Sequence, residues 1–297
     1  MIGVIHCTRT AAKDRWNTKD TILNPQSAIS PSQVLQLMDE LTALIARACN
    51  EIAAISPATV VQRLKPDQSP VTAADEASEA TILRGLARIL PNVPIVSEES
   101  ITARMPADLA GSFVVVDPLD GTREFLAGRD EFTVNLAIVT HGVPIAGIVA
   151  APKRERVWRG VPGHGAERLR LQAQGVSEGQ RIRTRPWPRT QPVVAVSRSH
   201  MDAATDAFVN ALGQVSRVAG GSAIKFCQVA EGSADVYPRL ATTCEWDVAA
   251  GQALVSAAGG IVTTPQGTPL RYGRASENFR VPGFVAWGDP AKVRAGR

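Results

Sequence analysis

Apolar residues recur at helical spacing in the first third of the chain. Ser30-Pro31 provides a helix cap followed by proline in the first turn, and residues 34–52 keep the three-to-four spacing after it. A second helix is predicted from about Ala73 to Leu90, where Pro91 ends it. Residues 1–30 have no clear period, and we expect them to form a poorly structured N-terminal extension.

The pattern then changes to short apolar runs that are typical of strands. The runs Ile95-Val96 and Phe113–Val116 each end in acidic residues. Phe132–Thr140 and Pro144–Ala151 flank a Gly-containing turn and predict a hairpin. Residues 153–189 are rich in Gly and Pro, and we expect irregular hairpins there.

Strands alternate with helices in the last third of the chain, beyond about Pro188. Strands are predicted at Val193–Val196 and Phe284–Trp287. Helices are predicted at Asp202–Leu212, Ala223–Glu231 and Val248–Ala258. This alternation indicates an α/β half. We therefore divide the chain into the extension 1–30, an N-terminal α+β part over 31–188 and a C-terminal α/β part over 189–297.

The composition of the 297 residues is that of a packed globular protein. Hydrophobic residues make up 44% of the chain, which excludes a disordered protein. The most apolar stretch, Val134–Pro152, is interrupted by Asn135, His141, glycines and prolines, so it predicts no membrane span. The apolar run Ile2–Ile5 is too short for a secretory signal.

Cysteine usage and net charge narrow the protein class further. The four cysteines are scattered without a Cys-x-x-Cys pair, which favours a reducing cytoplasm over a disulfide framework or a zinc site. The net charge is +4, and residues 153–189 hold ten Lys or Arg against three Glu. Only Trp158 and Trp187 accompany these charges, so we interpret the segment as a solvated face that steers anions, not as a nucleic-acid site.

The candidate chemistry lies in acidic residues that follow apolar runs. Asp117-Pro118-Leu119-Asp120-Gly121-Thr122 comes directly after Val114–Val116. Two carboxylates three residues apart at a turn can converge on one point with the Leu119 carbonyl, and such oxygens suit hard cations such as Mg²⁺. The alternative is an ordinary Asp-Gly turn in which Asp120 bonds its own backbone.

Three further acidic positions have the same context. Glu98 follows Ile95-Val96, and its alternative is a helix start or a solvated turn. Asp247 opens a small-residue helix, where it could simply cap that helix. Asp75 completes a capping box with Thr72, which is a structural signature. Together the four acidic turns predict a carboxylate-lined metal pocket.

These motifs resemble those of the inositol monophosphatase superfamily of Mg²⁺-dependent, lithium-sensitive phosphatases. The resemblance covers residues 33–288, and the superfamily motifs stand at Ser69–Asp75, Val96–Glu99, Asp117–Thr122 and Trp246-Asp247. Within the superfamily the chain is most similar to the bacterial 3'(2'),5'-bisphosphate nucleotidases of the CysQ type. The segments that carry this narrower resemblance are Arg123–Phe125, Glu131–Asn135, Val196–His200, Lys225–Cys227, Val229–Gly232 and Tyr237–Arg239.

The resemblance implies a fold of the α/β (α+β) class, a layered αβαβα sandwich with the active site between the two halves. It implies that two or more Mg²⁺ ions, which Mn²⁺ can replace, are bound by Glu98, Asp117, the Leu119 carbonyl, Asp120 and Asp247. It assigns catalytic roles to Asp75, Glu98 and Thr122, with Thr122 and Asp75 orienting the attacking water. The N–H groups of Gly121 and Thr122 would hold phosphate oxygens if they open a helix.

Substrate recognition is expected from the second half. By resemblance Ser197 and His200 lie near the nucleotide, while Ser222, Lys225 and Arg239 approach a second phosphate. The implied substrate-binding set also includes Leu119, Asp120, Gly121, Thr122 and Asp247. Lys225 could instead be a solvated helix residue, and Arg239 a surface residue after Tyr237-Pro238.

The leading functional hypothesis is hydrolysis of adenosine 3',5'-bisphosphate (PAP) to AMP and phosphate, which clears a by-product of sulfate activation in sulfur metabolism. The sulfated nucleotide PAPS is a second candidate substrate. One alternative is an inositol or other sugar phosphate, and another is a basic nucleic-acid-binding protein without catalysis. The expected partner is a small nucleotide bisphosphate rather than nucleic acid. We expect a cytoplasmic protein, with peripheral association at the inner membrane left open.

Overall fold

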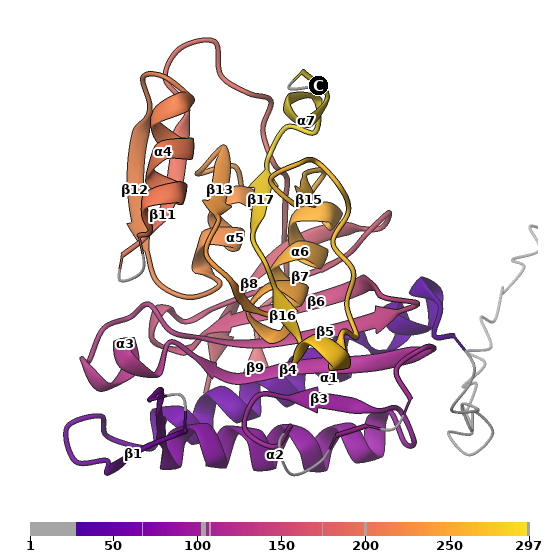
Figure 1. Cartoon of the computed structure of the whole chain (residues 1–297). Coiled ribbons are helices and arrows are strands. Elements are labelled where there is room, and N and C mark those ends of the chain that lie inside the picture. The colour runs from indigo at the N-terminus through magenta and orange to yellow at the C-terminus, as the bar shows by residue number, and fades with distance from the viewer. Residues whose placement is uncertain are drawn as a thin grey trace, which may run out of the picture.

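Five layers of helices and strands build the molecule (Figure 1). The computed structural model describes residues 28–295, apart from residues 67, 102–104, 107, 174 and 199–200. The first layer consists of helices α1 (Pro31–Ala53) and α2 (Ala73–Ile89), which pack side by side beneath a large sheet. Both helices begin with a capping box, formed by Ser30 with Gln33 and by Thr72 with Asp75.

The second layer is an eight-stranded, mostly antiparallel sheet. Its main path runs in the order β10-β8-β7-β6-β5-β4-β3, and β9 pairs with β8. The strand bounds are β3 (Ile95–Ser97), β4 (Ser112–Asp120), β5 (Thr133–Thr140), β6 (Val143–Ala151), β7 (Arg156–Val161), β8 (Gly165–Gln172), β9 (Gly175–Val176) and β10 (Gln180–Ile182). The short helix α3 (Thr122–Leu126) follows β4, and a 3-10 turn at Pro152–Arg154 precedes β7.

The expectation of irregular hairpins over residues 153–189 was wrong. Strands β7, β8 and β10 extend the large sheet in regular antiparallel register. The apolar side chains Val157, Leu169 and Leu171 are buried in the core beneath that sheet. Leu169-Arg170-Leu171 alternates apolar and basic residues, which is the pattern of a half-buried strand, but the Gly and Pro residues of the segment obscured it.

The basic residues of this segment are largely engaged in ion pairs. The partners are Arg154 with Asp130 and Glu131, Arg159 with Asp39 and Glu167, Arg168 with Glu231, Arg170 with Glu155 and Arg185 with Asp235. Five of the ten basic residues are therefore neutralised locally, which limits how strongly the segment can steer anions.

The third and fourth layers contain helices α5 (Ile224–Ala230) and α6 (Glu245–Ala257) and a five-stranded sheet. That sheet has the order β12-β11-β13-β17-β15. Its strands are β11 (Val193–Ser197), β12 (Ser216–Gly220), β13 (Val236–Arg239), β15 (Ile261–Thr263) and β17 (Phe284–Trp287). Helix α4 (Ala203–Ala211) covers its outer side as the fifth layer, so the predicted αβαβα sandwich is confirmed (Figure 1).

Smaller elements join the layers. Strands β1 (Gln62–Leu64) and β2 (Pro70–Thr72) form a separate hairpin, and β14 (Thr243–Cys244) pairs with β16 (Arg280–Val281). A 3-10 turn spans Ala275–Glu277, and α7 (Ala291–Ala295) ends the described chain. None of the helices in the described residues is both long enough and apolar enough to span a membrane.

The predicted extension 1–30 lies, up to residue 27, outside the described residues. Ile29 is buried, and its backbone is tied to two strands of the large sheet. Its N–H donates to Ser112 Oγ at 2.8 Å and its carbonyl accepts from Thr140 Oγ1 at 3.1 Å. Tertiary anchoring of the described chain therefore begins ahead of α1.

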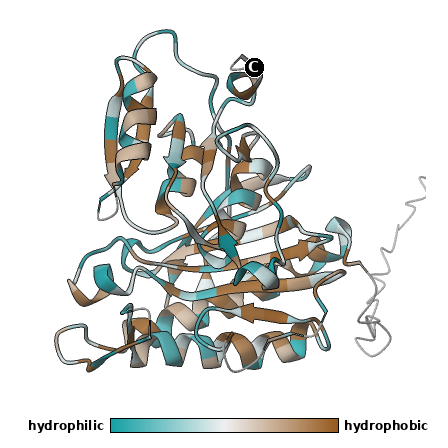
Figure 2. Ribbon diagram, viewed as in Figure 1, coloured by the Kyte–Doolittle hydropathy of each residue, from teal (hydrophilic) through white to brown (hydrophobic). Residues whose placement is uncertain are grey.

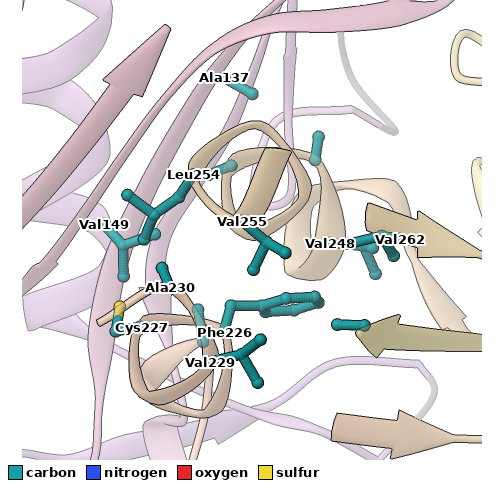
Figure 3. Packing of buried hydrophobic residues seen from close by; sticks show 14 of the residues in the cluster. Ala137, Val149, Phe226, Cys227, Val229, Ala230, Val248, Leu254, Val255 and Val262 are labelled. Carbon is teal, nitrogen blue, oxygen red and sulfur yellow. The ribbon is translucent and has the colours of Figure 1, made fainter. Parts of the chain in front are cut away.

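Helix α6 is the central packing element of the upper core. It begins at Glu245, three residues before the predicted start at Val248. Figure 2 shows the large sheet as mainly hydrophobic. In Figure 3, Leu254 of α6 lies beside Val149 of that sheet, Val248 lies beside Val262 of the five-stranded sheet, and Val255 points toward Phe226 of α5. Gly251 permits this contact, because a Cβ there would lie 2.3 Å from the Phe226 ring.

We expect Gly251→Ala to destabilise the protein by about 1–3 kcal/mol, because an added methyl group in a filled core forces neighbouring groups to move. Thermal unfolding would show the loss as a lower Tm. Ser256→Ala on the same helix, at a partly exposed position, is the control and should leave Tm nearly unchanged. Adding Phe226→Leu to Gly251→Ala should recover part of the loss; an equally unstable double variant would show that the ring is not the obstacle.

Candidate active site

An open cleft of about 1000 Å³ lies where the two sheets meet the N-terminus of α6. It collects residues from both halves of the chain. The predicted site residues that line it are Glu98, Asp117, Leu119, Asp120, Gly121, Thr122, Ser197, Ser222, Lys225, Arg239 and Asp247. Of the remaining two, Asp75 is buried behind Thr122, and His200 lies outside the described residues.

Three carboxylates form the centre of the cleft. One oxygen each of Asp117, Asp120 and Asp247 lies within 4.8 Å of the others. Asp117 and Asp120 are carried by the end of β4, where an irregularity in the pairing with β5 separates them. Asp247 lies in the first turn of α6 and accepts from the Cys244 N–H at 3.0 Å and from the Thr243 hydroxyl. The cap and cluster readings of Asp247 are thus compatible.

Glu98 lies beside this cluster and forms an ion pair that the sequence analysis missed. The Lys65 ammonium, from the loop between β1 and β2, lies 2.7 Å from Glu98 Oε1 and 2.7 Å from Glu99 Oε1. Burial opposes the charge of Lys65, but the two glutamates raise its pKa. A single lysine in a polar loop carries no sequence signal, because most such lysines are solvated.

The carboxylates strongly perturb one another. Burial, the first cause in each case, raises the pKa of Glu98 to about 8 and that of Asp120 to about 6, and it also raises the pKa of Asp117. Repulsion from Asp247 acts in the same direction on all three groups. The cluster therefore resists being fully ionised unless a positive charge joins it.

The donor set fits a hard divalent cation. Every candidate ligand offers oxygen, which is the ligand type that Mg²⁺ and Mn²⁺ prefer. Oδ2 of Asp117 is buried and receives no hydrogen bond from any residue that the structure describes. A buried acceptor left unpaired is costly, and a cation would satisfy it. Asp117, Asp120, Asp247 and Glu98, with the Leu119 carbonyl, are the groups that could hold it.

Gly121 gives the chain its sharp turn between β4 and α3. Its φ of +94° lies in the left-handed region, and a Cβ there would lie 2.2 Å from Ser222 Oγ. The Ser222 hydroxyl lies 2.7 Å from the Asp120 carbonyl and 2.9 Å from the Glu131 carbonyl. Ser222 therefore joins the two loops of the cleft through its hydroxyl.

Asp75 and Thr122 form the second predicted pair. Thr122 Oγ1 donates to Asp75 Oδ1 at 3.0 Å. The other oxygen of Asp75 accepts from the N–H and hydroxyl of Thr72, at 2.8 and 2.7 Å. The capping box thus fixes Asp75 while Asp75 holds Thr122 at the cleft. Burial raises the pKa of Asp75, and these hydrogen bonds act against that shift.

Lys225 and Arg239 place positive charge on the lining of the cleft. Lys225 is 2% exposed, which excludes the solvated-helix alternative. Its ammonium donates to the Ser222 carbonyl at 2.7 Å and the Gly220 carbonyl at 3.1 Å, which leaves one of its three N–H donors. Arg239 is mostly buried, and its Nε donates no hydrogen bond within the described part of the chain.

Thr133 and Asn135 were quoted in the sequence analysis only as part of a motif, and the structure brings both to Asp120. Thr133 Oγ1 and Asn135 Nδ2 each lie 3.3 Å from Asp120 Oδ2. Ser197, at the end of β11, lines the cleft as expected.

The stability of the metal-free protein should decrease from about pH 5 to pH 8. The unfolded chain releases the Asp and Glu protons near pH 4, whereas the folded protein holds those of Asp120 and Glu98 to about 6 and 8. Over this window the folded state binds more protons, so its free energy of unfolding decreases as pH rises.

The same Mg²⁺ concentration should therefore raise Tm more at pH 8 than at pH 5.5, with a gain of about 5 °C or more at pH 8 when it is 100 times the Kd at that pH. Thermal unfolding with and without EDTA at both pH values measures this. Asp120→Asn is the matched variant and should reduce both the pH slope and the Mg²⁺ effect. A Mg²⁺ effect of the same size at both pH values would contradict the ionisation argument.

Comparison with known proteins agrees with this geometry. The chain is 42% identical over 221 residues, or 74% of its length and 86% of the relative's, to the 3'(2'),5'-bisphosphate nucleotidase CysQ of Escherichia coli K12. Among solved structures it is similar to CysQ from Bacteroides thetaiotaomicron, with 33% identity and a TM-score of 0.70 over 86% of this chain and 97% of that one.

A second solved structure is an inositol monophosphatase from Zymomonas mobilis, with 26% identity and a TM-score of 0.69 over 87% of this chain and 96% of that one. Residues 33–282 match the sequence profile of the inositol monophosphatase family. Because this match spans most of the chain and most of the described fold, the protein belongs to the inositol monophosphatase family.

Proposed function

We propose that the protein is a metal-dependent 3'(2'),5'-bisphosphate nucleotidase that hydrolyses the 3'-phosphate of PAP to give AMP and phosphate. One observation carries the proposal: a single cleft is lined both by a carboxylate cluster and by two cationic side chains, Lys225 and Arg239. A substrate with two phosphates needs both, one for the reacting group and one for the group that is only bound. Relatives 36–42% identical to the chain are named as such nucleotidases.

The metal site of this proposal comprises Glu98, Asp117, the Leu119 carbonyl, Asp120 and Asp247. Two or more Mg²⁺ held there would supply a water of lowered pKa and neutralise the charge that develops on the leaving oxygen. Glu98 must first exchange Lys65 for the cation or share it, since the Lys65 ammonium lies 2.7 Å from it. The Lys65 loop thus borders the reacting end of the cleft.

Thr122 and Asp75 are proposed to orient the attacking water. Since the Thr122 hydroxyl donates its proton to Asp75, its remaining lone pairs face the cleft as acceptors. A water that donates to Thr122 would have its own lone pair turned toward the phosphorus. Asp75 holds Thr122 in this orientation, because its own second oxygen is fixed by two hydrogen bonds from Thr72.

Arg239 and Lys225 are proposed to bind the second phosphate. The unpartnered Nε of Arg239 and the third N–H of Lys225 are donors without a hydrogen-bond acceptor in the described part of the chain. Phosphate oxygens would supply those acceptors in charge-assisted hydrogen bonds. Ser197 also lines the cleft and is proposed to lie near the nucleotide, and Ser222 supports the Asp120 carbonyl.

The alternative substrates are PAPS, which has the same 3'-phosphate, and inositol phosphates. The latter are suggested by the similarity to the inositol monophosphatase from Zymomonas mobilis. An inositol monophosphate has no second phosphate for Arg239 and Lys225, so the buried cations favour the bisphosphate.

Phosphate release with Mg²⁺ should be faster from PAP than from inositol 1-phosphate, and EDTA should abolish it. Asp120→Asn and Asp247→Asn should each reduce kcat by more than about 100-fold, because each removes a charged ligand from the cluster. Circular dichroism would confirm that both variants are folded. Near-normal rates in either variant would remove it from the metal site, and a preference for inositol 1-phosphate would overturn the substrate assignment.

Arg239→Gln should lower kcat/KM for PAP by about 10-fold or more while changing that for 3'-AMP much less, since only PAP has the second phosphate. Steady-state kinetics on both nucleotides measures the difference. Arg217→Gln, an arginine paired with Asp206 on the surface, is the control and should change neither substrate. Equal losses on both nucleotides would show that Arg239 does not read the second phosphate.

A further inference from the structure

Strand β5 carries two buried polar side chains in an otherwise apolar run. Thr133 and Asn135 are 0% and 1% exposed. Their neighbours Val134, Leu136 and Ile138 belong to the hydrophobic core that the large sheet forms with helices α1 and α2. An amide or hydroxyl in such a place is costly unless it is hydrogen-bonded. What these two groups bond to therefore indicates why they are there.

The strand register places both side chains opposite the carboxylates. In the pairing of β4 with β5, Asn135 is the partner of Asp117 and Thr133 is the partner of Asp120. The pairing is irregular between Asp117 and Asp120, so the two aspartates three residues apart face two residues of β5 that are two apart. Thr133 and Asn135 lie on one face of β5, since side chains alternate along a strand.

Both side chains donate to the same oxygen atom. Asn135 Nδ2 and Thr133 Oγ1 each lie 3.3 Å from Asp120 Oδ2. Two donors on Oδ2 restrict the orientations that the Asp120 carboxylate can adopt in the cluster.

A second observation links Asn135 to a ligand rather than to packing. Its Oδ1 is buried and accepts no hydrogen bond within the described residues, and the same is true of Asp117 Oδ2 on the partner strand. Thr140, at the other end of β5, differs: its hydroxyl contacts Ser112 Oγ at 2.8 Å and the Ile29 carbonyl at 3.1 Å. Two unsatisfied acceptors on residues paired in the strand register favour a cation with its water.

We propose that Asn135, assisted by Thr133, is a positioning residue that orients Asp120 for cation binding. This inference rests on the metal site of the proposed function and extends it to a group that does not itself contact the cation. Outer groups of this kind hold a ligand in its binding orientation before the cation arrives, and their removal weakens metal affinity about 10–100-fold.

The test measures Mn²⁺ binding by calorimetry on the full chain without nucleotide. Asn135→Ala should weaken Mn²⁺ binding about 10–100-fold, and Thr133→Val, which keeps the shape of the side chain, should weaken it less. Thr140→Val makes the same isosteric change on the same strand away from Asp120 and should leave the Kd unchanged. Circular dichroism and Tm in EDTA would show whether each variant is folded.

A double variant tests whether Asn135 acts through Asp120. In an Asp120→Asn background, adding Asn135→Ala should weaken Mn²⁺ binding much less than it does in the wild type, because the group that it positions is already altered. Equal losses in both backgrounds would contradict the positioning role. If Asn135→Ala fails to fold, Thr133→Val alone and in the Asp120→Asn background decides the question.

The outcomes separate this inference from the proposed function. Unchanged Mn²⁺ affinity in Asn135→Ala and Thr133→Val, with tight binding by the wild type, would overturn the positioning role alone. Absence of Mn²⁺ binding by the wild type would overturn the metal site and the positioning role together. A substrate other than PAP would overturn only the nucleotidase assignment, because the calorimetry involves no substrate.

Discussion

Carboxylates that are held together in a buried cleft repel one another, and the elements that carry them must resist that repulsion. Asp117, Asp120 and Asp247 bring oxygens within 4.8 Å of one another, and Glu98 adds a fourth acid. Isolated charges this close and this buried would separate if the chain allowed it. The rigid elements prevent that separation: the end of β4 carries two of the aspartates, and the first turn of α6, packed between two sheets, carries the third.

The surrounding cations balance this repulsion from different directions. Lys65 approaches Glu98 and Glu99 from the β1–β2 loop, while Lys225 of α5 and Arg239 of β13 also line the cleft. The cleft therefore holds both an acidic cluster and basic side chains. Such an arrangement suits an anionic substrate that bridges the two regions, with its reacting group bound at the acids through a cation.

Much of this could be predicted from the sequence, because the acidic motifs are local and each follows an apolar run. The sequence context of Asp117, Asp120 and Asp247, together with a family resemblance, was sufficient to predict them as site residues. Lys65 could not be found, since its role depends on a loop that brings it to residues more than 30 positions away. Strands β7 and β8 were missed because the Gly and Pro residues of the segment outweighed its alternation of apolar and basic residues. The ion partners of Arg159 and Arg168 are also distant in sequence.

Helix α6 unites two properties that most enzymes can vary separately. Its inner face consists of small and branched side chains, and at Gly251 it approaches Phe226 without room for a methyl group. Its first turn also supplies Asp247. A change in the distance between α6 and its neighbours would consequently also move the Asp247 carboxylate in the site. Selection would therefore act on core substitutions along this helix through enzyme activity as well as through stability, although none of the substituted residues would contact the substrate.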